Sequence, residues 1–157
     1  MLSYQADNAS LSTQLGSFLR LAGLWVLRKR AEFVQATRQG INAVRPGFVL
    51  QYLPPPSSEK QEKPRLPRVG FTASRKVGGA VSRNRAKRRL RAIAQQGLPS
   101  IAQVGATYVL IARQRTLTRS FTQLEQDFSS ALREVHRKSA GSKSSPEDRQ
   151  SKTANRG

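Results

Sequence analysis

Apolar side chains recur with the period of an α-helix toward the C-terminal end of the chain. Within residues 120–137 they return every three or four positions and therefore gather on one face of a helix. Ser120 and Gln123 have the spacing of a capping box, which satisfies free backbone N–H groups at a helix start. We expect a helix here that packs through Phe121, Leu124, Phe128, Ala131, Leu132 and Val135.

Two more helices are predicted earlier in the chain. Residues 80–96 have a helical pattern, and we expect Gly97 and Pro99 to end this helix because both residues disfavour a helix interior. Residues 30–39 form a shorter candidate. It is followed by Gly40, which we expect to end the helix in the left-handed conformation.

Three segments have the patterns of β-strands. Residues 47–53 and 106–112 are short apolar runs of the kind found in buried strands. Residues 68–74 alternate apolar and polar positions, which gives a strand with one apolar face. Residues 54–67 hold five of the eight prolines and predict an exposed connector, because proline supports neither a helix interior nor a strand ladder.

These elements predict one small α+β domain over residues 17–137. The apolar stretch at residues 15–27 is expected to add a short helix or strand, and it is too short to span a membrane. Residues 1–16 are polar and predict a flexible arm, and residues 138–157 predict a disordered basic tail. No signal-peptide pattern is present, so we expect a soluble, cytoplasmic protein.

The charge balance changes this picture from a generic domain to one that binds a polyanion. The 157 residues include 28 Lys and Arg against 9 Asp and Glu, a net charge of +19. Such an excess repels itself in a compact state unless an anionic partner offsets it. Nucleic acid and anionic membrane are the two obvious partners.

The basic side chains cluster where acidic ones are absent. No Asp or Glu occurs from Lys63 to Leu124, and within that stretch Arg83, Lys87 and Arg91 repeat at helical spacing. Like charges one turn apart destabilise an isolated helix, so we interpret this face as a phosphate-binding surface rather than an ordinary solvated one. The same helix carries an apolar stripe of Ala86, Leu90, Ile93 and Ala94.

Two features each allow two interpretations. Gly78 and Gly79 precede the basic helix, where they can present N–H groups to an anion or form a tight turn. Phe33 can be a core residue or a stacking platform for unpaired bases. For the second interpretation, Ala31 and Val34 are expected to serve the core side of the short helix.

The composition argues against catalysis by the protein itself. The nine acidic residues are scattered and form no pair suited to acid–base chemistry or Mg²⁺ binding. The absence of cysteine and the single histidine, His136, remove thiolate chemistry and histidine metal clusters. We therefore expect a binding protein that holds no metal or cofactor of its own.

The segment from Arg68 to Arg91 resembles the signature of the bacterial ribonuclease P protein family. Its hallmark is the Arg-Asn-Arg run at residues 83–85, followed on the same helix by further cations. Residues 27–33 are similar to the family's first helix, and residues 48–50 and 108–113 to its first and last strands. The resemblance covers about residues 27–137 in consistent order.

The resemblance implies both a fold and an activity. The family has a central, mostly antiparallel sheet with one parallel βαβ unit, an uncommon left-handed crossover. Its order is α-β-β-β-α-β-α, of which one strand is not evident in this sequence. The family's RNA subunit, with bound Mg²⁺, hydrolyses the phosphodiester bond between the 5′ leader and the mature tRNA. The implied partners are that RNA and precursor tRNA, with no membrane and no obligate protein partner.

The resemblance also implies which residues meet RNA. A cleft between the first helix and the sheet would hold the single-stranded leader, lined by Phe33 and Phe48. Relatives often have aromatic side chains where this chain has Thr37 and Gln51, so we expect weaker stacking in the cleft. The implied RNA-binding residues are Arg68, Arg75, Lys76, Arg83, Asn84, Arg85, Lys87, Arg88 and Arg91.

Other classes of protein share the charge and the size. A ribosomal or other RNA-scaffold protein is the main alternative, followed by a DNA-compacting protein and a protein bound at a membrane surface. Affinity capture separates the first alternative from the family assignment, because the captured RNA is either ribosomal or one ribonuclease P RNA.

Overall fold

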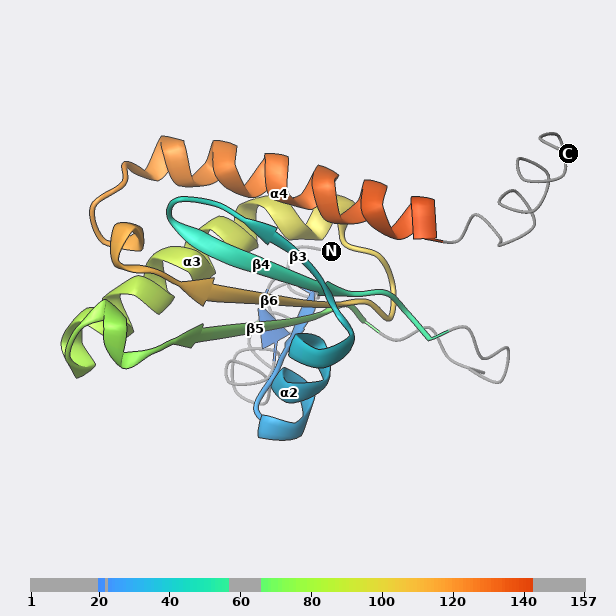
Figure 1. The fold of residues 1–157 in the computed structure, drawn as a ribbon, viewed down its shortest axis with the longest axis horizontal. Coiled ribbons are helices and arrows are strands. Elements are labelled where there is room, and N and C mark those ends of the chain that lie inside the picture. Colours follow the sequence, from blue (N-terminus) through green and yellow to red (C-terminus); the bar gives the residue numbers. More distant parts are fainter. Residues whose placement is uncertain (1–19, 22, 57–65, 143–157) are drawn as a thin grey trace, which may run out of the picture.

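A six-stranded mixed sheet forms the centre of the molecule, with helices on both faces (Figure 1). The computed structural model describes residues 20–21, 23–56 and 66–142. The strands are β1 (Arg20–Leu21), β2 (Leu24–Val26), β3 (Ile41–Val44), β4 (Phe48–Leu53), β5 (Arg68–Ala73) and β6 (Thr107–Ala112). The helices are α2 (Arg30–Gln39), α3 (Ala80–Ile101) and α4 (Phe121–Ser142), with 3₁₀ turns η1 (Arg75–Val77) and η2 (Gln114–Thr116).

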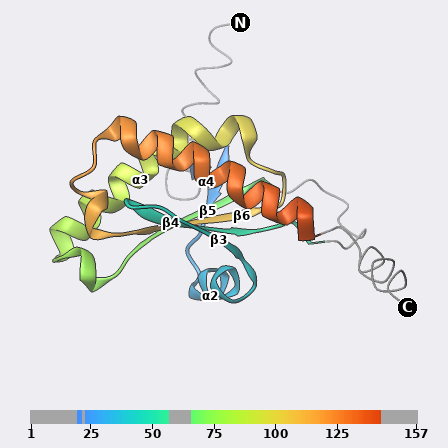
Figure 2. The same cartoon turned by 45° about the horizontal axis from the view of Figure 1, so that its top comes forward.

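The strand order is β1-β2-β5-β6-β4-β3. Strands β5 and β6 are parallel neighbours joined through α3, which confirms the predicted βαβ unit. Strand β2 also runs parallel to β5, a pairing that the sequence did not suggest. The remaining three pairs, β1–β2, β3–β4 and β4–β6, are antiparallel. Helices α3 and α4 cover one face of the sheet, and α2 covers part of the other (Figure 2).

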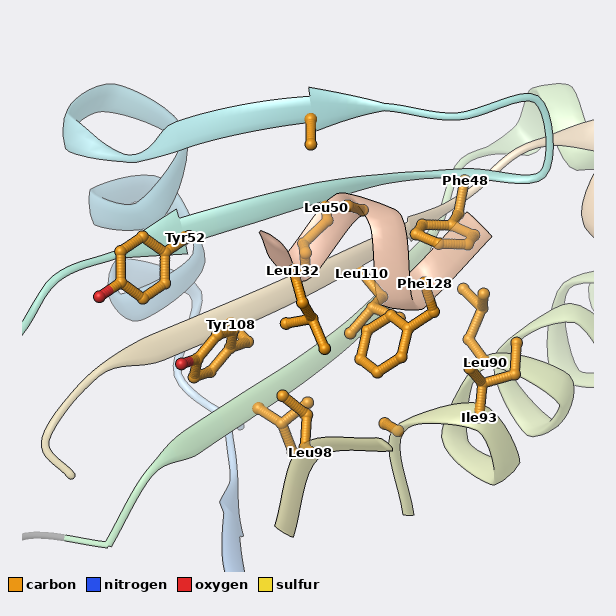
Figure 3. Close-up of a cluster of buried hydrophobic side chains, with 14 of the residues drawn as sticks. Phe48, Leu50, Tyr52, Leu90, Ile93, Leu98, Tyr108, Leu110, Phe128 and Leu132 are labelled. Atoms are coloured by element: carbon orange, nitrogen blue, oxygen red, sulfur yellow. The ribbon is translucent and has the colours of Figure 1, made fainter. Parts of the chain in front are cut away.

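The main core lies between the sheet and the pair α3–α4 (Figure 3). Because strand side chains alternate, every second residue of β4 and β6 points into it. The rings of Phe48 and Phe128 pack with centroids 6.1 Å apart. Burying each large side chain contributes about 1.5–3 kcal/mol, so this layer supplies most of the folding energy. The largest buried residues here are Leu24, Phe48, Leu50, Tyr52, Leu90, Ile93, Leu98, Tyr108, Leu110, Leu124, Phe128 and Leu132.

Helix α3 does not stop where its glycine and proline predicted. It continues through both residues to Ile101. A Cβ atom on Gly97 would lie only 2.8 Å from the Phe128 ring, so the glycine serves close helix packing rather than termination. Leu98 is fully buried, which stabilises the extra turn, while Pro99 lies on the exposed side.

Helix α2 ends at the predicted residue for a different reason. Gly40 has φ −80°, so the expected left-handed conformation is wrong. A Cβ atom there would lie 2.2 Å from the Ala36 carbonyl oxygen and 3.1 Å from that of Tyr52. The glycine therefore permits a close backbone approach as the chain enters β3. At the other end, the Glu32 carboxylate accepts the backbone N–H of Lys29 at 3.3 Å.

Two strands and the end of α4 complete or correct the predicted set of elements. Strand β3 is the one that the sequence left unread, because of its four residues only Ala43 is buried. Strand β2 confirms the strand interpretation for part of residues 15–27. Helix α4 runs to Ser142 with Ser139 buried, so the predicted tail beginning at residue 138 starts too early.

Parts of the predicted organisation lie outside the described residues. These parts are the arm at residues 1–16, most of the connector and the chain after Ser142. Residues 54–56 and 66–67 of the connector have no regular structure. Among the helices that the structure describes, none is both long enough and apolar enough to cross a bilayer.

Candidate RNA-binding surface

Helix α3 buries the predicted apolar stripe and exposes four of the predicted outer residues, while Arg83 and Lys87 are half-buried. The four residues of the apolar stripe are each at most 1% exposed. Asn84, Arg85, Arg88 and Arg91 are exposed, and no acidic residue occurs anywhere on this helix. Arginine forks bind phosphate oxygens bidentately, so this outer face suits the backbone of a structured RNA.

One edge of α3 runs beside an open strand. The Arg91 guanidinium lies 5.6 Å from the centroid of the Phe71 ring on β5. Among the described strands, β2 pairs with β5 only at Arg68 and Val69, so the second half of β5 has a free edge there. The basic edge of the helix and the open sheet edge therefore adjoin.

A groove of about 550 Å³ lies between α2 and the sheet. Phe33 lines it while also packing against the sheet, since a Cβ atom on Gly70 would lie 2.6 Å from the Phe33 ring. Phe33 therefore packs against the sheet and also lines the groove, and its role as a stacking platform for bases stays a prediction. The expected core residues Ala31 and Val34 are exposed instead, and Ala36 is the buried residue of α2.

Phe48 is not in this groove, so that prediction was wrong. Its side chain is 0% exposed and belongs to the main core on the opposite face. Strand alternation gives the reason, because residues 48, 50 and 52 of β4 share one face of the sheet. On the groove side, β4 contributes Gln51.

Thr37 and Gln51, the two positions where relatives often have aromatic side chains, contact each other. The Thr37 hydroxyl lies 3.2 Å from Gln51 Oε1 and 3.0 Å from the Phe33 carbonyl oxygen. A polar pair therefore lies beside the apolar floor made by Val109 and Ile111 of β6. The groove retains Phe33 as the aromatic side chain of α2.

A second hollow of about 960 Å³ extends the same face of the sheet. It shares Ile111 with the groove, and its far rim carries Lys76, Arg113 and Arg115. The sequence assigned Lys76 to RNA but missed the two arginines. Alternation along the strand could have revealed Arg113, because it follows Ile111 by two positions and therefore lies on the same face of the sheet.

Two assigned cations lie away from both hollows. Arg68 pairs with Glu32 of α2 at 3.3 Å, which offsets its charge. Arg75 is exposed on η1 and lines neither hollow. Most of the assigned RNA-binding residues therefore surround one region, formed by the outer face of α3, the groove and the basic rim.

Three of the four acidic residues that the structure describes are held in ion pairs with arginines. Besides the pair at Glu32, Asp127 binds Arg119 and Glu134 binds Arg45, each at 2.8 Å. Within the described residues, no three metal-ligating side chains gather. Cations on this surface are therefore left to meet an external anion.

Comparison with known proteins decides the family. The family model described as Ribonuclease P matches residues 21–136, which include α2, α3 and the groove. The chain belongs to the ribonuclease P protein family. A ribonuclease P protein component from Paramagnetospirillum magneticum is 42% identical over 109 residues, covering 69% of this chain and 80% of that protein. One from Ruegeria pomeroyi is 44% identical over 116 residues, covering 73% and 89%.

Solved ribonuclease P proteins share the fold. The protein from Thermotoga maritima aligns with a TM-score of 0.56 at 22% identity, covering 69% of this chain and 96% of that one. One from Staphylococcus aureus gives 0.53 at 23% identity, covering 69% and 92%. Ribonuclease P proteins work with an RNA subunit in tRNA 5′-end processing, as part of an endoribonuclease.

Proposed function

We propose that this protein binds ribonuclease P RNA through the outer face of α3 and holds the 5′ leader of precursor tRNA along the sheet. The observation that carries the proposal is the continuity of the groove and the basic rim at Ile111. A strand laid there meets an aromatic ring at one end and three cations at the other. Apolar stacking with flanking phosphate contacts is the arrangement that single-stranded nucleic acid favours.

The proposed division of surfaces follows from geometry. Structured RNA needs a convex, guanidinium-rich face, which α3 presents through Arg85 and Arg88. An unpaired strand needs a groove whose recognition tolerates many sequences. Phe33 supplies a stacking surface worth about 1–3 kcal/mol per base whatever the base. The amide of Gln51 and the hydroxyl of Thr37 add polar contacts without demanding one sequence.

We also propose that the RNA subunit performs the hydrolysis with its own Mg²⁺. The donor set of the protein supports this division, since the carboxylates of Glu32, Asp127 and Glu134 are paired with arginines. Hard divalent cations prefer several free oxygen ligands, which the described surface does not gather. The protein would contribute binding energy that brings the leader and the catalytic RNA together.

The test is the affinity of the reconstituted holoenzyme for two substrates. Precursor tRNA with a leader of several nucleotides should bind roughly tenfold or more tightly than mature tRNA, given the stacking energy available. Equal affinities would contradict the proposed leader groove. In parallel, the protein captured from cells should carry mainly one ribonuclease P RNA, and a capture dominated by ribosomal RNA would contradict the proposed partner.

A further inference from the structure

One arginine of the basic helix points inward. Arg89 lies among the cations of α3, yet its guanidinium donates to the carbonyl oxygens of Thr116 and of Arg119, the latter at 2.6 Å. Both acceptors belong to the segment that connects β6 to α4. Neighbouring Arg85 and Arg88 are exposed and face outward. The donors of Arg89 are thus used within the protein.

The segment that Arg89 holds is hydrogen-bonded to two other loops, the β3–β4 turn and η1. The buried Thr116 hydroxyl donates to the Gly47 carbonyl in the β3–β4 turn and accepts the backbone N–H of Arg113 at 2.9 Å. The Gln114 side chain donates to the Lys76 carbonyl in η1 at 2.9 Å. These bonds fix turn η2 against its neighbours at one end of the sheet.

Turn η2 and the residue before it carry the two arginines of the basic rim. Arg113 precedes it and donates to the Arg45 carbonyl at 3.0 Å, while Arg115 lies within it and is exposed. A turn held at both ends loses little backbone entropy when its side chains bind a phosphate. Fixing the turn therefore strengthens the rim without any contact between Arg89 and the ligand.

We propose that Arg89 is a positioning residue, which sets Arg113 and Arg115 at the rim for the phosphates of a single-stranded RNA. The inference rests on the proposed leader groove and deepens it. The planar guanidinium fork reaches the two carbonyl groups from two separate nitrogens, whereas a lysine ammonium has all its donors on one nitrogen and does not match this geometry. The bridge, and not the positive charge, is what matters at this position.

The experiment compares leader-dependent affinity in the reconstituted holoenzyme, measured as the ratio of affinities for precursor and mature tRNA. Arg89→Met and Arg89→Lys should each lower this ratio by about tenfold, on the scale of hydrogen bonds to charged groups. Arg133→Met, an exposed charge loss on α4, is the matched control and should leave the ratio unchanged. Rescue by Arg89→Lys would overturn the proposal, because it would show that charge alone suffices.

A second arm tests the route of the effect. In a protein that already lacks both rim arginines (Arg113→Met with Arg115→Met), adding Arg89→Lys should cause no further loss, since coupled residues are not additive. If the loss from Arg89→Lys multiplies with the loss from the two rim substitutions, the proposal is overturned. If Arg89→Met does not fold, as a melting curve will show, the Arg89→Lys arms carry both tests.

Failure of this inference is distinguishable from failure of the proposed function. A wild-type holoenzyme that does not favour precursor over mature tRNA rejects the leader groove itself. A wild-type protein with a clear preference, unchanged in both Arg89 variants, rejects only the positioning role.

Discussion

The two faces of the central sheet use the same strands for different purposes. On one face, every described large side chain of β4 and β6 packs against α3 and α4, and Phe48, Leu110 and Phe128 have at most 1% exposure. On the other face, α2 covers only part of the strands, so Val44 is 59% exposed and the groove and basic rim remain open. Alternation along each strand thus separates the packed face from the open face, to which we assign RNA binding.

This contrast predicts that substitutions on the packed face act on stability first. Leu90→Ala should lower the free energy of unfolding by about 2–5 kcal/mol, because the side chain is fully buried and leaves a cavity. Denaturant unfolding measures the loss. The folded fraction should still bind the RNA subunit normally. A loss below about 1 kcal/mol would show that this face is not the packed core.

A substitution between the two faces should affect both properties. Gly70→Ala places a methyl group 2.6 Å from the Phe33 ring, so the ring or the strand must shift. Overpacking of this kind costs about 1–3 kcal/mol of stability. The displaced ring should also weaken binding of precursor tRNA relative to mature tRNA. Full leader affinity in a folded variant would mean that the position of Phe33 is unimportant.

Between pH 7.5 and 5.5, a pH effect on stability should come from His136 on the packed face. The Tyr108 hydroxyl accepts the Gln103 N–H at 3.0 Å and forms a hydrogen bond of 2.9 Å with His136 Nε2. Burial lowers the pKa of His136, so the unfolded chain takes up a proton more readily than the folded protein. Stability should therefore fall as the pH drops through about 6.5.

The matched variant for this effect is His136→Gln, which keeps a hydrogen-bonding side chain beside Tyr108 but does not titrate. Thermal melting at pH 7.5 and 5.5 should show a smaller difference for the variant than for the wild type. Leader-dependent affinity, scaled to the folded fraction, should stay the same in both. An equal pH dependence in the two proteins would show that His136 does not cause the loss of stability at low pH.

Exposed cations should have the smallest effect on stability. Arg85→Ala and Arg88→Ala should leave the free energy of unfolding within about 0.5 kcal/mol, as for other exposed sites. Each should weaken RNA-subunit binding and reduce the slope of log affinity against log salt by about 0.7–0.9. Unfolding of these variants, with unchanged RNA affinity, would invert the assignment of the two sides of α3.

The sequence predicted features that depend on local periodicity and on the long basic motif. The stripe of α3 and the capping of α4 follow from spacing within one element, and both are confirmed: Ser120 and Gln123 exchange hydrogen bonds at 3.2 Å. The wrong placement of Phe48 in the groove was avoidable, because alternation along β4 puts residues 48 and 51 on opposite faces of the sheet. Alternation along β6 likewise predicts that Arg113 lies on the same face of the sheet as Ile111.

Other features depend on tertiary contacts that no spacing reveals. Gly97 lies within the helix because Phe128 from another helix packs on it. Arg89 is an arginine on the same helix as the exposed Arg85 and Arg88. It points inward only because the segment before α4 offers it two carbonyl groups. Strand β3 has one buried residue and pairs with β4 through its backbone, which leaves little pattern in the side chains.

The central claim is that the RNA subunit and the leader occupy separate surfaces of one small domain. The most direct test measures both affinities for Arg88→Ala and Phe33→Ala, with melting temperatures as the control for folding. The account predicts that Arg88→Ala weakens RNA-subunit binding and spares the preference for precursor over mature tRNA. Phe33→Ala should do the reverse. If each variant lowers both affinities by the same factor, the RNA subunit and the leader do not occupy separate surfaces.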